Sequence, residues 1–159
     1  LNPPDIKNVD NIKSILELCN SKYFINGIES LEKIPSNSVD YIFSQAVLEH
    51  IDKYQFEKFL NETKRILKKD GVCSHRVDLT DHLGGKLNNL RFSEKVWESK
   101  LFKNSGFYTN RLRCSEILDL CKRNNIPLQI SMGGGYSNDL KDIIEAHSNT
   151  FRLAQEIFF

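Results

Sequence analysis

The 159-residue sequence lacks a long hydrophobic run and a CxxC cysteine pair, and its opening residues lack the pattern of a secretory leader. No apolar stretch approaches the roughly 20 residues that cross a membrane, and the opening LNPPDIKNVD has neither a basic head nor an apolar core. Four cysteines, at positions 19, 73, 114 and 121, favour small reduced thiols over a disulfide or zinc framework. These absences predict a cytoplasmic protein with no membrane partner.

The sequence also lacks an excess of either charge. Twenty-two basic and 21 acidic residues give a formal net charge of +1, so the basic excess of a dedicated nucleic-acid binder is missing and we expect no nucleic-acid partner. The length of 159 residues fits one domain. The sequence opens on Leu-Asn-Pro-Pro without an initiator methionine, from which we expect upstream sequence to be missing.

What the sequence does contain is a strand, helix, strand pattern. Residues 39–44, VDYIFS, are β-branched and aromatic, as in an interior strand. Apolar residues then recur at helical spacing from Phe56 to Leu67, after a capping box of Asp52 and Gln55. Asp70-Gly71 is expected to turn the chain into a strand over 72–79. This order predicts an α/β fold with a parallel sheet and a right-handed crossover.

The flanking segments predict further elements. Before the first strand we expect a helix from a cap at Asp10 to Asn20, a short strand over 22–25 and a connecting segment with one helical turn near Leu31. After the second strand we expect a modest helix within 91–102, a helix capped by Ser115 and a strand over 127–130. The last predicted element is a helix from Ser137, and one of its faces carries Leu140, Ile143, Ile144, His147, Phe151 and Ala154.

Ionisable residues cluster where the strand over 72–79 ends. The cluster contains His75, Arg76, Asp78, Asp81 and His82. Buried ionisable groups are costly unless they are paired, bind a metal or take part in chemistry, and ligands gather at the carboxyl ends of parallel strands. Strand alternation places Ser74, Arg76 and Asp78 on one face and Cys73, His75, Val77 and Leu79 on the other.

Two interpretations of this cluster stay open on the residues alone. Arg76 and Asp78 on one stripe indicate either a polar ligand or a fixed salt bridge. A metal site made by His75, Asp78 and His82, as in a metal hydrolase, is disfavoured because an extended chain places these residues on different faces. We therefore expect no metal there.

Two other segments are candidate binding loops. In SQAVLEHI, Ser44, Gln45 and Ala46 would face the same crevice as the loop after Asp78 and hydrogen-bond a cofactor, whereas Glu49 and His50 are interpreted as cap and surface residues rather than as an acid or base. In SMGGGYSN, Gly133 and Gly135 match G-x-G, but Asn138 replaces the third glycine, so a flexible turn is favoured over a phosphate site.

The stretch IPSNSVDYIFSQAVLEHIDKYQFEKFLNETKRILKKDGVCSHRVDL resembles the middle and later part of a class I S-adenosylmethionine-dependent methyltransferase. The resemblance is carried by Asp40 at the start of a strand, by residues 44–50 leaving its end, and by RILKKDG leading into the next strand. It implies a partial Rossmann-like sheet, mainly parallel, made of the family's later strands with flanking helices. Residues 83–110 resemble a substrate-side insertion after the fifth strand.

The resemblance implies S-adenosylmethionine as the cofactor and a small-molecule methyl acceptor. By position, the methionine end of the cofactor would lie at Ser44, Gln45 and Ala46, and its adenine at Gly27, Ile28 and Glu29. The acceptor would meet the rim formed by His75, Arg76, Asp78, Asp81 and His82. For a hydroxyl acceptor, His75 or His82 would act as the base, because imidazole titrates near neutral pH, while Asp78 and Arg76 would orient the acceptor.

The family's glycine-rich first loop and the acidic residue that grips the ribose have no counterpart before Lys22. The resemblance therefore implies an N-terminally truncated methyltransferase domain over 1–159, inactive alone, whose exposed strand edges favour a homodimer. The alternative is a non-catalytic α/β module that binds a partner through Trp97, Phe102, Phe107 and Tyr108, although such residues usually pack in a core.

Overall fold

The computed structural model describes residues 9, 11–84, 86–131 and 139–158. The chain forms two compact units, residues 1–34 and residues 35–159. Within the described ranges, no helix is both long enough and apolar enough to cross a membrane.

The first unit contains helix α1 (Ile12–Leu18) and the 3-10 helix η1 (Gly27–Lys33). Asn11 caps α1, because its side-chain oxygen accepts the N–H of Ser14 at 2.9 Å, and Asn20 has a left-handed φ of 47° just after the helix. Asp10, the predicted cap, lies outside the described residues. The expected helical turn near Leu31 is confirmed by η1.

The predicted strand over 22–25 is wrong. These residues have no regular structure, and Tyr23 and Ile25 are 72% and 79% exposed. A strand exists only when a neighbour takes its backbone hydrogen bonds, and the described residues of the first unit contain no second strand. Aromatic and β-branched composition alone therefore misled the prediction.

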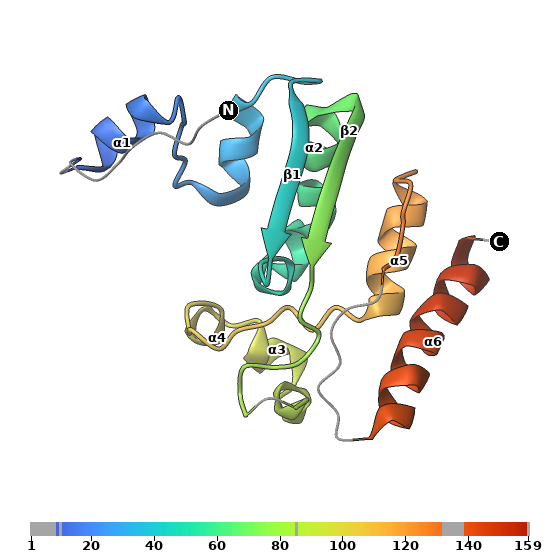
Figure 1. Cartoon of the computed structure of the whole chain (residues 1–159). Coiled ribbons are helices and arrows are strands. Elements are labelled where there is room, and N and C mark those ends of the chain that lie inside the picture. Colours follow the sequence, from blue (N-terminus) through green and yellow to red (C-terminus); the bar gives the residue numbers. More distant parts are fainter. Residues whose placement is uncertain (1–8, 10, 85, 132–138, 159) are drawn as a thin grey trace. The chain divides into compact units, whose positions relative to one another are not determined.

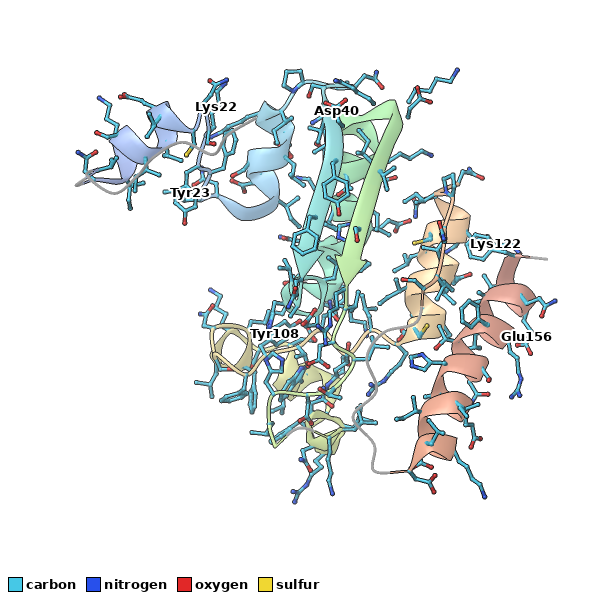
Figure 2. The ribbon with its side chains drawn as sticks, in the orientation of Figure 1. Lys22, Tyr23, Asp40, Tyr108, Lys122 and Glu156 are labelled. Carbon is cyan, nitrogen blue, oxygen red and sulfur yellow. The ribbon has the colours of Figure 1, made fainter. Side chains whose placement is uncertain are left out.

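The second unit is built on the predicted parallel strand pair. Strand β1 (Val39–Gln45) is followed by 3-10 turns η2 (Leu48–His50) and η3 (Lys53–Gln55), helix α2 (Phe56–Ile66) and strand β2 (Leu67–Arg76). The two strands pair in parallel, and α2 lies behind them (Figure 1). This arrangement confirms the α/β prediction and fits a partial Rossmann-like methyltransferase fold. At the amino end of β1, Asp40, labelled in Figure 2, pairs with Lys68 at 2.7 Å.

Two local predictions in this unit need correction. Asp52 caps η3 through the N–H of Tyr54 at 2.9 Å, so it starts a 3-10 turn before α2. Asp70-Gly71 does not make a turn but lies inside β2, at a break in register between the pairs Val39–Leu67 and Tyr41–Val72. A Cβ at Gly71 would lie 2.9 Å from the carbonyl oxygen of Val39, so close backbone approach requires glycine there.

One face of the sheet packs on α2. Along β2, Cys73 and His75 are half-buried while Ser74 and Arg76 are exposed, as the alternation predicted. The predicted strand over 72–79 is wrong beyond Arg76, where β2 ends, so Asp78 and Leu79 lie outside the strand. The apolar face of α2 joins a core cluster that also draws on η2 and α5, with members Leu48, Phe56, Leu60, Leu112, Leu120 and Cys121. On the other sheet face, Tyr41, Phe43 and Val72 are exposed.

The predicted helix within 91–102 is replaced by short turns. These are η4 (Asn88–Arg91), α3 (Glu94–Trp97) and α4 (Lys100–Lys103). Trp97 is fully buried, its indole N–H donates to the carbonyl of Thr109 at 2.7 Å, and four aromatic rings surround it, those of Phe92, Phe102, Phe107 and Tyr108. The aromatic stretch therefore forms a local core rather than an exposed surface.

The last two helices are α5 (Cys114–Arg123) and α6 (Leu140–Phe158), which lie side by side (Figure 1). Helix α5 begins one residue before the predicted cap Ser115, and the Glu116 carboxylate accepts the N–H of Arg113 at 2.9 Å. The predicted strand over 127–130 is wrong, since these residues have no regular structure and find no strand partner.

The predicted apolar face of α6 is only partly turned inward. Ile143, His147 and Ala154 are half-buried. Leu140, Ile144 and Phe151, by contrast, are 67%, 57% and 45% exposed.

Candidate functional site

The carboxyl ends of β1 and β2 meet at one edge of the sheet, where Gln45 is paired with Arg76. Ala46 follows with a left-handed φ of 52°, and its N–H donates to the carbonyl of Arg76 at 2.9 Å. A positive φ is uncommon for a residue with a Cβ, and here it bends the chain sharply from β1 toward η2. The predicted cofactor residues Ser44, Gln45 and Ala46 therefore lie at the end of β1, where ligands gather in parallel sheets, but the side chains of Ser44 and Gln45 point to opposite faces of the sheet.

Ser44 and His75 form a side-chain pair between the two strands. The Ser44 hydroxyl lies 2.7 Å from Nδ1 of His75, and the imidazole packs against the Phe59 ring of α2 at 6.1 Å between centroids. Burial lowers the pKa of His75, so the ring is held neutral near pH 7. Because side chains alternate, this pair lies on the α2 side of the sheet, whereas Gln45 and Arg76 are exposed.

The two acidic residues of the predicted rim have different environments. Asp78 accepts the N–H and the hydroxyl of Thr80 at 2.9 and 2.7 Å. Burial alone would raise the pKa of Asp78, but these bonds and the nearby charges of His82 and Arg76 lower it.

Asp81 is 1% exposed, and its carboxylate accepts backbone N–H groups of Leu83, Lys86 and Asn89. Asp81 therefore holds the loop that carries His82 rather than facing a ligand.

His82 meets two residues of η2. Its ring lies 4.8 Å from the ring of His50, centroid to centroid, and the ligand atoms of Glu49, His50 and His82 all lie within 4.8 Å of one another. Glu49 is 3% exposed, so its interpretation as a surface cap is wrong. We call these three residues the Glu49 cluster.

Asn110 fixes the turn that carries Glu49 and His50. Its side-chain amide donates to the carbonyls of Leu48 and Ile51 at 2.8 and 2.9 Å, and its backbone N–H donates to the carbonyl of Glu49 at 2.7 Å. His50 Nδ1 lies 2.8 Å from the carbonyl of Tyr108, which is labelled in Figure 2. Sequence reasoning missed Asn110, because no local pattern links it to a turn about 60 positions away.

A small cavity lies beside the cluster, lined by Glu49, Asp78, Asn89, Arg111 and Arg113 among others. Several buried polar atoms of these residues lack a hydrogen-bond partner in the described part of the chain: both Glu49 carboxylate oxygens, Asn89 Oδ1, Arg111 Nε and Arg113 Nη2. Burial lowers the pKa of Arg111, whose guanidinium lies 4.8 Å from the centre of the Trp97 ring. Unpaired buried polar atoms are rare, and together they mark a place for a polar ligand, an ion or water.

The remaining predicted site residues belong to other parts of the sequence. Gly27, Ile28 and Glu29 belong to η1 of the first unit, where Gly27 has a left-handed φ of 54°. Gly133, Gly135 and Asn138 lie outside the described residues.

Residues 4–74 match the model of a family described as a methyltransferase domain. The matched stretch contains β1, η2, η3, α2 and most of β2. The match supports a class I S-adenosylmethionine-dependent methyltransferase domain. Neither the curated proteins nor the solved structures contain a match to the chain.

Proposed function

From the methyltransferase domain that residues 4–74 match, we propose that the chain serves S-adenosylmethionine-dependent methyl transfer to a small-molecule acceptor. In this reaction the acceptor atom attacks the sulfonium methyl, the carbon–sulfur bond breaks, and S-adenosylhomocysteine leaves with the electron pair. The protein supplies alignment and a base where the acceptor carries a proton. One observation carries the proposal: the paired carboxyl ends of β1 and β2 gather polar side chains at one edge.

For the cofactor, we propose that Ser44, Gln45 and Ala46 approach its methionine end. Ala46 supports this role because its left-handed backbone turns the chain at the strand end, where backbone groups can reach a ligand. The adenine is assigned to Gly27, Ile28 and Glu29 through the resemblance alone. Glu29 lies in the first turn of η1, just after the positive-φ Gly27.

For the acceptor, we propose that His82 or His75 takes the proton of a hydroxyl and that Asp78 and Arg76 orient the molecule. His82 is exposed at the rim. His75 is half-buried and bound to the Ser44 hydroxyl, so it would act on an acceptor through that hydroxyl. The segment 83–110, with its Trp97 core, would form the acceptor-side wall.

We further propose that this chain does not transfer methyl groups as a monomer. In the described residues β1 pairs only with β2, which leaves its other edge open, and Tyr41 and Phe43 are 58% and 62% exposed. Open edges and exposed aromatic side chains favour pairing between chains. A homodimer through the β1 edge would extend the sheet around the cofactor.

Light scattering combined with calorimetry tests both parts. We expect a dimer, with heat of S-adenosylmethionine binding that follows the dimer fraction as the protein is diluted. Gln45→Ala should weaken that binding by about tenfold, the loss of one to two hydrogen bonds, while Gln155→Ala on the exposed side of α6 should leave it unchanged. A dimer that gives no heat at millimolar ligand contradicts the cofactor assignment, and a monomer that binds tightly contradicts the edge pairing.

The alternative, a non-catalytic module with an aromatic interface, is not favoured. Two of its four proposed anchors, Trp97 and Tyr108, are 0% and 4% exposed and bond to Thr109 and Glu98 within the fold.

A further inference from the structure

The carboxylate of Glu49 is buried and has no hydrogen-bond partner among the described residues. It is 3% exposed, and neither oxygen accepts a hydrogen bond from any described residue. Removing a carboxylate from water costs several kcal/mol unless a donor, a cation or a metal ion compensates. An ion bound beside the carboxylate would compensate this cost.

Two imidazoles lie within reach of this carboxylate. His50 and His82 bring ring nitrogens within 4.8 Å of each other and of a Glu49 oxygen. Two histidines and one carboxylate are a donor set typical of zinc and of related divalent transition metals. In a tetrahedral zinc site the ligand atoms lie about 3.4 Å apart, so small side-chain rotations suffice to close the set on an ion.

The hydrogen bond of His50 prepares it as a ligand. A backbone carbonyl only accepts, so the 2.8 Å contact to the carbonyl of Tyr108 makes Nδ1 of His50 the donor. In the neutral ring, Nε2 then carries the lone pair. Metal-binding histidines commonly donate their other nitrogen to a carbonyl in this way.

Hydrogen bonds from the surrounding structure hold the two segments that carry the three candidate ligands. Asn110 ties the turn of Glu49 and His50 through three hydrogen bonds, and Asp81 orders the loop of His82 through backbone N–H groups. Support from neighbouring hydrogen bonds is what distinguishes a built metal site from a chance cluster.

We propose that Glu49, His50 and His82 bind one divalent transition-metal ion, with zinc as the best fit. Three protein ligands leave a fourth position open toward the exposed histidine side, as in zinc sites that take a water or a substrate oxygen. Binding of the ion by these residues does not depend on the proposed methyl transfer. With the ion bound, His82 is a ligand, which leaves His75 as the candidate base. The location at the carboxyl edge of the sheet places the open position where an acceptor oxygen would arrive.

Titration with Co²⁺ and Zn²⁺, without S-adenosylmethionine, tests the site. We expect one Co²⁺ per chain with visible d–d bands and no thiolate charge-transfer band, and displacement of Co²⁺ by Zn²⁺. Glu49→Gln and His82→Gln should each weaken Zn²⁺ binding by at least about tenfold, since each removes one of three ligands. His147→Gln, on α6, is the matched control and should bind as the unaltered chain does.

Circular dichroism checks that each variant is folded, and His82→Gln provides the test should Glu49→Gln not fold. The proposal is overturned by a chain that binds no Co²⁺, by thiolate bands, which would place the ion on cysteine, or by a folded His82→Gln variant with unchanged affinity. A failure here leaves the cofactor test untouched, because that test contains no metal.

Discussion

The hydroxyl of Ser44 lies 2.7 Å from Nδ1 of His75, and this bond joins the ends of two strands that are 31 positions apart in sequence. Both side chains lie on the α2 face, where Phe59 packs on the imidazole. The pair therefore ties the register of the parallel sheet to the packing of α2, and a protonated imidazole would disturb both.

The pH dependence of stability should report on His75. Burial lowers the folded-state pKa of His75 below 6.5. As the pH falls through 6.5, the unfolded chain therefore binds more protons than the folded chain, and the free energy of unfolding decreases until the folded-state pKa is passed. Urea unfolding at about pH 8 and about pH 6, on either side of the reference histidine pKa, should show this loss of stability. His75→Gln should remove that part of the loss, and His147→Gln should keep it. An unchanged loss in His75→Gln would contradict the assignment.

Gly71 should not tolerate a side chain. A Cβ there would lie 2.9 Å from both the Val39 carbonyl oxygen and Leu67 Cδ2, and the carbonyl belongs to the paired backbone. We expect Gly71→Ala to lower the free energy of unfolding by about 1–3 kcal/mol, the range for overpacking. In Gly106→Ala the new Cβ meets nothing within 4 Å, so that control should be neutral or slightly stabilising. Equal effects of the two substitutions would disprove the close contact.

The strand, helix, strand unit was predictable because its signals are local. The apolar spacing from Phe56 onward and the β-branched run at 39–44 each specify one element by local sequence. The helix that connects β1 to β2 then brings the two strands into parallel pairing. The runs at 22–25 and 127–130 carry similar strand propensity, yet neither has a partner strand in the described residues. A strand forms only with a partner that is distant in the sequence, and the strand propensity of the residues carries no information about that partner.

The candidate site was predictable in place but not in detail. Parallel pairing places Gln45 beside Arg76 at the carboxyl ends of the two strands, as the order of elements predicted. The roles of single residues depended on contacts far along the chain. Asn110 holds the turn that carries Glu49 through bonds to the carbonyls of Leu48 and Ile51, and the Asp81 carboxylate accepts backbone N–H groups. No rule of sequence spacing predicts that the Asp81 carboxylate binds the backbone while the Asp78 carboxylate lies at the rim.

Trp97 should be essential to the segment 83–110. It is fully buried among aromatic rings, and its indole N–H satisfies the carbonyl of Thr109. Trp97→Phe removes that donor and part of the ring, so we expect a loss of about 1–3 kcal/mol in the free energy of unfolding, the cost of an unsatisfied buried group. Circular dichroism during urea unfolding measures it. Leu101→Ala, at a side chain that is 80% exposed, should change little, and a similar loss there would argue against a local core.

Asp81 should stabilise the His82 loop in a pH-dependent way. Burial alone would raise the pKa of Asp81, but N–H groups of Asn89, Lys86 and Leu83 lower it below 3.8. Its contribution is therefore complete above pH 3.8 and is lost as the pH falls through the lowered folded-state pKa.

Asp81→Asn should consequently lower the Tm by several degrees near neutral pH, because the amide NH₂ group would face backbone donors, and the difference should shrink in acid. Asp70→Asn, at an exposed position on β2, serves as the control and should show no such pattern. A Tm difference caused by loss of the carboxylate charge must decrease in acid, as Asp81 of the unaltered chain becomes protonated. If the Tm difference for Asp81→Asn were constant from neutral pH down to about pH 3, the carboxylate charge would not be what holds the loop.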